Sequence, residues 1–176
     1  PIREFGPPIL DFVSEIPMPA LNGMFDGLYP PGMQWYWRAH YFNELTDEAI
    51  DVNIEFGQKI PNFHTTTHLY PIDGAVHEVA NHETAWANRD ARWAQVIVGV
   101  DPDPANAQQI TDWCKDFYEA LTPHAMGGAY VNFMMEEGQE RIKASYKDNY
   151  ERLVSVKSEY DPSNFFHVNQ NIKPVS

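Results

Sequence analysis

The strongest constraint on the fold is a stripe of large apolar side chains that repeats at helical spacing in the second half of the chain. Asp103 and Pro104 precede it, as is typical of a helix start, and Pro123 follows its last member. Its members are Ile110, Trp113, Cys114, Phe117, Tyr118 and Leu121. Burial of even four of these side chains contributes roughly 6–12 kcal/mol before the entropic cost is subtracted. The stripe therefore indicates a helix packed on a core, and not a cofactor site.

Segments with strand character supply the surface that this helix needs. The run from Met33 to Phe42 is rich in aromatic residues and is predicted to be a strand. Three further strands are predicted at 63–72, 92–100 and 128–134. Thr46 is a typical N-cap, and the helix that it starts is expected to reach Ile60 before Pro61.

The order of these elements predicts the fold class. Strand, helix, strand, strand, helix and strand form two β-α-β halves, as in ferredoxin-like split units. We therefore expect an α+β fold, an antiparallel sheet with the helices on one face, and extra C-terminal helices. The expected divisions are a connector at 1–32, a β-α-β-β-α-β core at 33–134, and C-terminal helices and a tail at 135–176.

The connector is rich in proline and glycine, so no helix is expected in it. Apolar residues nevertheless occur along it: Ile9, Leu10, Phe12, Val13, Met24 and Phe25. A free, solvated linker does not need such residues. We expect the connector to pack on the rest of the domain.

Size and charge exclude several classes of function. The chain has 176 residues, 43% of them apolar and 14% aromatic, which suffices for one domain with a core. Its 12 basic and 25 acidic residues give a net charge of -13, which disfavours nucleic acid and anionic membrane surfaces as partners. No apolar run has the roughly 20 residues of a membrane span. A single cysteine permits no internal disulfide, and a cytoplasmic location is expected.

Alternation along the strands predicts a polar sheet face. If the apolar side of each strand meets the helices, the alternate residues point away from them. They are Tyr36, Arg38, His40, His64, Thr66, His68, Tyr70, Gln95, Tyr130 and Asn132. Such side chains suit a partly buried surface that hydrogen-bonds a ligand. The alternative is an interface without chemistry, and a slip of one residue in register would invert the set.

No metal site is predicted. His77, Glu78 and His82 are similar to a zinc-protease helix motif, but that motif needs its second histidine at position 81. His64 and His68 lie about 13 Å apart on a strand, at about 3.3 Å per residue, which is too far to ligate one ion.

Two other reactive groups are assigned structural roles. Cys114 belongs to the apolar stripe, so an inert buried thiol is expected. The Glu136, Glu137 and Glu140 cluster is interpreted as a solvated helix start that the helix dipole stabilises.

Several segments of the chain resemble a known family. GGAYVNF (127–133), NYERLVSVKSEYDPSNFF (149–166) and NQNI (169–172) are similar to the terminal berberine-bridge segment of flavin-linked oxidases. Upstream, GPPILDFV, MFDGLYPPG, YWRAHYFNELTDEAI, DGAVHEV and ETAWANRDARW resemble the substrate domain of bacterial members. The resemblance to the berberine bridge enzyme type extends over essentially the whole chain.

The resemblance implies a two-domain, FAD-dependent oxidase. In such enzymes an N-terminal domain binds FAD, and the sheet of a substrate domain covers the isoalloxazine. They oxidise alcohols, sugars or amines by hydride transfer to the flavin, which oxygen reoxidises. This chain is expected to be the substrate-side half, with a small-molecule substrate. Its FAD-binding domain would belong to the same or a separate chain.

The resemblance also assigns residues. Tyr130 matches the tyrosine beside the flavin that takes a proton from the substrate. A free phenol ionises only near about pH 10, so it needs a positive neighbour, for which Arg38, His40 or His68 are candidates. The cofactor-binding residues are expected to be Asn132, Asn169, Gln170 and Asn171. Substrate-binding residues are expected to be Tyr36, Arg38, His40, His68 and Tyr70.

Two departures from the family pattern keep other functions open. Met134 and Met135 stand where the family usually has an acid, and Asn88 stands where relatives commonly have histidine. One alternative is a stand-alone binding or interaction domain that kept the fold without the chemistry. Another is a cofactor-free enzyme that uses the same sheet face.

Overall fold

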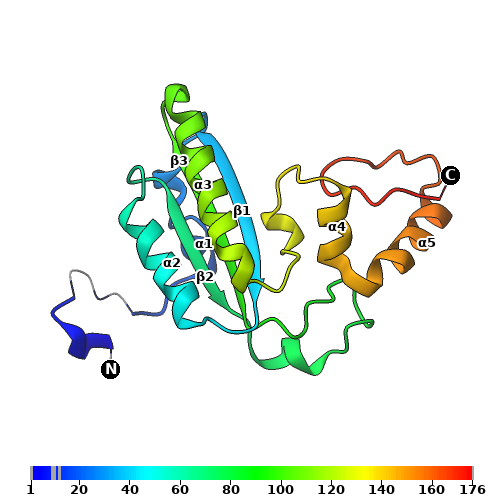
Figure 1. Cartoon of the computed structure of the whole chain (residues 1–176), viewed down its shortest axis with the longest axis horizontal. Coiled ribbons are helices and arrows are strands. Elements are labelled where there is room, and N and C mark those ends of the chain that lie inside the picture. Colours follow the sequence, from blue (N-terminus) through cyan, green and yellow to red (C-terminus); the bar gives the residue numbers. More distant parts are fainter. Residues whose placement is uncertain (1, 9–10, 12, 176) are drawn as a thin grey trace. The chain divides into compact units, whose positions relative to one another are not determined.

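The computed structural model describes residues 2–8, 11 and 13–175, so Ile9, Leu10 and Phe12 of the connector lie outside the described residues. The chain divides into two compact units, Pro1–Pro31 and Gly32–Ser176 (Figure 1).

The first unit contains short helical elements. They are η1 (Ile2–Phe5), α1 (Met18–Asn22) and η2 (Asp26–Leu28). The expectation of no helix was therefore wrong for α1, which has Pro19 in its first turn, where the missing N–H of proline costs no hydrogen bond. That this segment packs on the rest of the chain stays a prediction.

The second unit has the predicted α+β composition. Its strands are β1 (Gln34–Phe42), β2 (Thr66–Pro71) and β3 (Trp93–Asp101), and its helices are α2 (Asp47–Gln58), α3 (Ala107–Leu121), α4 (Gln139–Tyr146) and α5 (Tyr150–Tyr160). Short 3-10 turns connect them: η3 (Gly74–Glu78), η4 (Pro104–Asn106), η5 (Thr122–His124), η6 (Val131–Phe133) and η7 (Lys147–Asn149). Within the described part of the chain, no helix is both long and apolar enough to cross a membrane.

The sheet is antiparallel with the order β1-β3-β2, and α3 lies along one face of it (Figure 1). The predicted stripe forms the core between them, because Trp113, Cys114, Phe117 and Leu121 cluster with Phe42, Ala49 and Ile97. The contact is closest at Gly99, where an added Cβ would lie 2.8 Å from the Cβ of Ile110. Burial of the Cys114 thiol in this core confirms its structural role.

The predicted strand at 128–134 was wrong. Gly127 and Gly128 have φ angles of 77° and 67°, which extended strands do not use, and η6 follows directly. Within the described residues, the sheet therefore has three strands rather than the four of a split β-α-β arrangement.

The segment 126–141 instead covers the outer edge of β1 with separate hydrogen bonds. The Met126 N–H donates to the Tyr41 carbonyl over 2.9 Å, and Arg141 donates to the Ala39 carbonyl over 2.8 Å. The Trp37 N–H lies 3.3 Å from the sulfur of Met135. These contacts satisfy edge groups that a fourth strand would otherwise pair.

The predicted polar face was inverted for β1 and β3. Gln95 is buried on the helix side, where its Nε2 donates to Asn53 of α2 over 2.7 Å. The β1 residues Tyr36, Arg38 and His40 also face the helix layer. The opposite side of β1 is not open, because Ala39 packs with residues of the 129–150 region. Since both sides of β1 are covered, polarity does not distinguish them.

Candidate functional site

An aromatic pocket lies on the sheet side opposite α3. It has a volume of about 340 Å³, and its lining is almost wholly apolar. Its lining residues are Tyr41, Tyr70, Ile72, Val76, Trp86, Ala94, Tyr130 and Phe133. A cavity of this size is at the lower end of the range that small-molecule sites usually occupy, about 300–1,000 Å³.

Strand pairing explains the floor of the aromatic pocket. Ala94 of β3 pairs with Tyr41 of β1 on one side and with Tyr70 of β2 on the other. Residues directly opposite each other in a sheet share a face. This row therefore places one tyrosine on each side of Ala94. The small side chain of Ala94 leaves room between them.

The walls come from irregular segments. Trp86 belongs to the loop between β2 and β3, and its indole N–H donates to the Tyr41 hydroxyl over 2.8 Å. The guanidinium of Arg89 stacks over the Trp86 ring at 4.6 Å. On the opposite wall, Phe133 stacks with Tyr70 at 5.7 Å between ring centroids.

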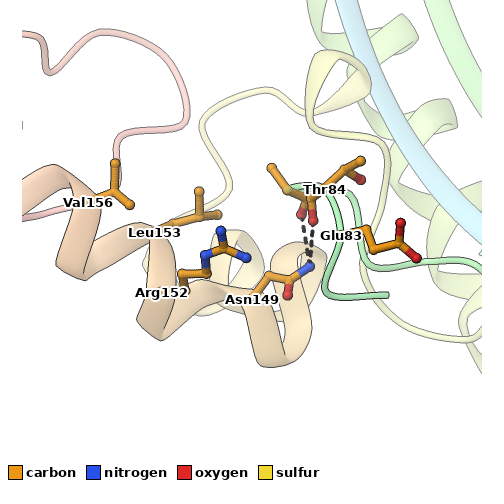
Figure 2. A pocket seen from close by; sticks show the side chains of 7 residues that line it. Glu83, Thr84, Asn149, Arg152, Leu153 and Val156 are labelled. Atoms are coloured by element: carbon orange, nitrogen blue, oxygen red, sulfur yellow. Dashed lines mark hydrogen bonds between the residues drawn. The ribbon is translucent and has the colours of Figure 1, made fainter. Parts of the chain in front are cut away.

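Asn149 attaches the loop that contains Trp86 to the start of α5 by hydrogen bonds. As Figure 2 shows, this residue at the start of α5 points its amide at the loop, where it donates to the carbonyls of Thr84 and Ala85. The same amide donates to the Asn81 carbonyl. Arg152, one turn further along, donates to the His82 carbonyl over 3.0 Å. The groove here, about 180 Å³, is lined by Glu83, Thr84, Ala85, Asn149, Arg152, Leu153 and Val156. Its polar atoms serve to attach α5 to the loop.

Tyr130 lies at the rim of the aromatic pocket. Its residue is 38% exposed, and its ring meets Phe133 edge-on with 5.1 Å between centroids. The Asn132 amide donates to the Tyr130 hydroxyl over 2.8 Å. The predicted catalytic residue is thus accessible, and one amide fixes the direction of its oxygen.

A second phenol of the pocket is held neutral. Burial raises the pKa of Tyr41 to about 12, against a smaller lowering by the hydrogen bond from Trp86, and the negative charge of an ionised Tyr130 would raise it further. Tyr41 therefore keeps its proton throughout the neutral range.

A polar cavity of about 470 Å³ lies on the other side of the Asn132–Tyr130 hydrogen bond, since Asn132 lines it. Its lining residues are Trp37, Val131, Asn132, Met134, Tyr146, Val168, Asn169 and Gln170. Three of the four predicted cofactor residues, Asn132, Asn169 and Gln170, therefore share one cavity. The fourth, Asn171, accepts a hydrogen bond at its carbonyl from Gln139 over 3.1 Å.

One residue that lines the polar cavity, Trp37, has an indole N–H that is unpaired within the described part of the chain. The indole Nε1 of Trp37 is buried and has no partner among the described residues. Such a donor costs free energy unless a ligand or water accepts from it. The carboxamides of Asn132 and Asn169 supply both donors and acceptors in the same cavity. This donor set fits the heteroatom edge of a flavin ring.

The predicted substrate-binding residues divide between the two faces. Tyr70 lines the aromatic pocket, and His68 stacks on Tyr70 at 6.0 Å between centroids. Tyr36, Arg38 and His40 lie on the helix side. Arg38 and His40 therefore do not supply a positive charge beside Tyr130, contrary to expectation.

His40 has a structural role under α3. Its ring stacks on Tyr118 at 4.1 Å with 6° between planes, and Nε2 donates to the Tyr118 carbonyl over 2.9 Å. Burial lowers the pKa of His40 to about 4. The hydrogen bond to the Tyr118 carbonyl opposes this with a smaller effect, and the charges of Arg141 and Arg38 lower the pKa further. The imidazole is neutral at pH 7.

Glu137 is not the solvated helix start that the sequence indicated. Its side chain is only 2% exposed and lies 2.8 Å from Arg38 and 3.4 Å from Arg141. Burial alone would lower the pKa of Arg38, but the charge of Glu137 and the Tyr36 hydroxyl raise it above its ordinary value. This ion triad ties the segment that follows Tyr130 to β1.

The sequence missed Tyr41, Trp86 and Phe133 as pocket residues. Tyr41 was assigned to the helix side by the inverted alternation. Trp86 lies in an irregular loop, where periodicity carries no signal. Phe133 stands within the GGAYVNF motif, so closeness to Tyr130 was the one available indication.

Comparisons with known proteins match this chain to flavin-linked oxidoreductases. Residues 129–173 match the family model described as "Berberine and berberine like". The chain is similar to an FAD-linked oxidoreductase of Dictyostelium discoideum, with 28% identity over 176 residues that cover 99% of this chain and 38% of the relative. It is similar to the uncharacterized FAD-linked oxidoreductase YgaK of Bacillus subtilis, with 32% identity over 131 residues that cover 74% of this chain and 29% of the relative.

Solved structures share the fold. The crystal structure of a glycopeptide hexose oxidase complexed with teicoplanin matches 80% of this chain and 32% of its own, with a TM-score of 0.72 and 24% identity. Berberine bridge enzyme from Eschscholzia californica matches 80% of this chain and 33% of its own, with a TM-score of 0.69 and 20% identity. The chain thus spans 29–38% of the length of these four proteins.

Proposed function

Because this chain belongs to the berberine bridge enzyme-like family of FAD-linked oxidoreductases, we propose that it is the substrate-binding half of such an enzyme. The proposed reaction removes a hydride and a proton from an alcohol, sugar or amine. The carbon that carries the oxygen or nitrogen loses the hydride, the heteroatom loses the proton, and a carbonyl or imine results.

One observation carries the proposal: a single hydrogen bond joins the two cavities. Tyr130 lines the aromatic pocket, Asn132 lines the polar cavity, and the amide of Asn132 donates to the Tyr130 oxygen over 2.8 Å. A substrate in the first cavity would thus meet a fixed phenol oxygen next to a cavity whose donors suit a flavin.

The proposed proton acceptor is Tyr130 rather than Tyr41. Both phenols line the aromatic pocket, but burial raises the pKa of Tyr41 to about 12. The Tyr41 oxygen also accepts the Trp86 N–H, whereas Tyr130 is at the rim. Tyr41 would orient a bound substrate as a neutral group. Tyr130, in its phenolate form, would accept the proton as it leaves the substrate and become a neutral phenol.

The residues proposed to hold FAD line the polar cavity. Trp37 and Asn132 would donate to ring oxygen or nitrogen atoms, and Asn169 and Gln170 would place the C-terminal tail against the cofactor domain. Gln170 is fixed for this role by donating to the carbonyls of Met134 and Met135. When bound, FAD would accept the hydride and pass the electrons to oxygen. Most contacts to FAD would come from a separate domain in the same or another chain.

Co-expression with the FAD-binding domain of a relative tests the proposal. Turnover of alcohol, sugar and amine substrates is measured by oxygen consumption, for the natural sequence and for Tyr130→Phe. Removal of a general base typically lowers the rate by about 10²–10⁴-fold. Tyr160→Phe, at a residue that is 78% exposed on α5, is the matched control. Full activity of Tyr130→Phe would refute the assigned role.

A second candidate is a binding domain without chemistry. No charged side chain lines either cavity among the described residues, so the positive neighbour expected for Tyr130 is missing from their lining. The departures from the family pattern have structural contacts: the Asn88 amide donates to the Ser145 carbonyl over 2.9 Å, and the Ser145 hydroxyl donates to the Met134 sulfur. Ligand binding with no turnover in any flavin-loaded form would favour this candidate.

A further inference from the structure

We propose that the aromatic pocket binds the planar ring of an aromatic alcohol or amine, and not a sugar ring. This inference rests on the proposed function, because it names the substrate class of the same site. It is carried by the aromatic and apolar lining of the pocket.

The walls of the pocket are aromatic faces at different angles. Tyr70 and Phe133 are inclined by 30° with centroids 5.7 Å apart, whereas Tyr130 stands at 87° to Phe133. Trp86 stands at 67° to Tyr41, with which it is in edge-on contact. A planar aromatic ring placed against this lining can make offset-stacked and edge-to-face contacts at once, which are the arrangements that aromatic pairs prefer.

The pocket offers few hydrogen bonds for a sugar. Its polar side-chain atoms are the hydroxyls of Tyr41, Tyr70 and Tyr130 and the indole N–H of Trp86, which is already bonded to Tyr41. Ile72, Val76 and Ala94 complete the lining with carbon. A hexose would bury several hydroxyls without partners here, and an unpaired buried polar group opposes binding.

Two exposed tyrosines of the pocket suit a ring that carries one reactive group. Tyr130 is 38% exposed and Tyr70 is 43% exposed, whereas Tyr41 is 1% exposed on the floor. A ring inserted toward Tyr41 would leave its CH–OH or CH–NH group beside the Tyr130 oxygen. The apolar part then supplies affinity, and the phenol fixes orientation.

Direct binding to the 176-residue chain tests the substrate class without flavin. The probes are 2-naphthalenemethanol and methyl β-glucopyranoside, which both carry a primary alcohol and differ in the ring. Saturation-transfer NMR and titration measure their dissociation constants. We expect the naphthyl alcohol to bind at least about tenfold more tightly than the glucoside, since only its ring gains stacking.

Variants locate the binding. Tyr70→Ala on the edge strand is expected to weaken the naphthyl alcohol about 3- to 10-fold, which is the range for loss of an aromatic contact. Ala94→Leu fills the floor and is expected to weaken it similarly, and thermal unfolding checks that each variant is folded. Tyr160→Ala, a substitution of an exposed tyrosine on α5, should leave binding unchanged. Equal or tighter binding of the glucoside, or no binding of the naphthyl alcohol, would overturn the inference.

A flavin ring is also planar and aromatic, so a second experiment tests whether the aromatic pocket binds the substrate or the flavin. With the FAD-binding domain of a relative present, the naphthyl alcohol should still bind and perturb the flavin absorbance, and Tyr70→Ala should weaken it. Loss of binding in the flavin-loaded form would assign the pocket to the cofactor ring and overturn the inference. Binding that persists without oxidation would count against the proposed reaction alone.

Discussion

The amide of Asn132 donates to the hydroxyl of Tyr130 over 2.8 Å, across two residues of a single turn. The same turn, η6, is fixed at its two sides: Phe133 stacks on Tyr70 of β2, and the Gln170 amide reaches the Met134 carbonyl. The position of the phenol oxygen is therefore set by two side chains from outside the turn and one from within it.

Loss of the Asn132 amide should slow turnover through Tyr130. We expect Asn132→Ala to lower kcat by roughly 10- to 100-fold, the effect of losing a hydrogen bond to an oxygen that becomes charged. In a Tyr130→Phe background the same change should have little further effect, because the two residues act as a unit. Steady-state rates of the flavin-loaded single and double variants measure this. Additive losses would show that Asn132 acts independently of Tyr130.

His40 should make the fold less stable in mild acid. Its pKa is about 4 in the folded chain and 6.5 in the unfolded chain, so between these values only the unfolded state takes up the proton. Its effect is absent above pH 6.5, and stability falls as pH drops from 6.5 to about 4, by roughly 3 kcal/mol in total. Urea unfolding across this range measures the slope.

His40→Gln is the matched variant, since its amide can still donate to the Tyr118 carbonyl. It should remove that part of the pH dependence. His167→Gln, at an exposed histidine, should leave it unchanged. Identical slopes for His40→Gln and the natural sequence would contradict the lowered pKa.

Gly99→Ala should destabilise the sheet-helix contact. The added Cβ would lie 2.8 Å from both the Cβ and the carbonyl oxygen of Ile110, so β3 and α3 must move apart. Overpacking of this kind typically costs about 1–3 kcal/mol. Gly57→Ala in α2 is the control, because its Cβ would meet nothing within 4 Å, and it should instead stabilise by about 0.5–1 kcal/mol. Chemical denaturation distinguishes the two signs.

Cys114 should resist thiol reagents in the folded chain. Burial raises its pKa from 9.0 to about 12, which lowers the thiolate fraction by about a thousandfold at pH 8. Reaction with a disulfide reagent should be undetectable before unfolding and should then report one thiol, since the chain has one cysteine. Fast reaction of the native chain would show that α3 does not shield it.

Glu137→Gln should loosen the segment 126–141. The buried carboxylate lies between Arg38 and Arg141, so its loss leaves two guanidinium groups without a negative partner. We expect a loss of roughly 1–3 kcal/mol, because the arginines remain partly hydrated. Glu136→Gln, at the exposed neighbouring residue, should change stability by less than about 0.5 kcal/mol.

The sequence was informative where one side of an element faces solvent. The stripe on α3 was predicted with small errors in its bounds, because burial there has one direction. The strand at 93–101 was located with similar accuracy, but it is buried on both faces, so its two sides could not be told apart. For β1 the alternation failed. Tyr36, Arg38 and His40 have flat or long apolar parts that pack under Tyr118, while Trp37 and Ala39 meet a second layer.

Part of the candidate site depends on the family resemblance rather than on periodicity. Asn132 lies far from Asn169 and Gln170 in the sequence, and only the similarity of the tail indicated that they belong together. The buried role of Glu137 could not be found from sequence, since acidic clusters near helix starts are usually solvated. Its partner Arg38 is about a hundred residues earlier in the chain.

The segment 126–141 opposes self-association through the outer edge of β1. Backbone groups of Trp37, Ala39 and Tyr41 along its outer edge are occupied by the segment 126–141, so a second chain cannot add a strand there without displacing that segment. Among the described strands, β2 is the other end of the sheet and pairs only with β3. Edge-to-edge aggregation of this chain would therefore begin at β2, where Pro71 interrupts the row of donors.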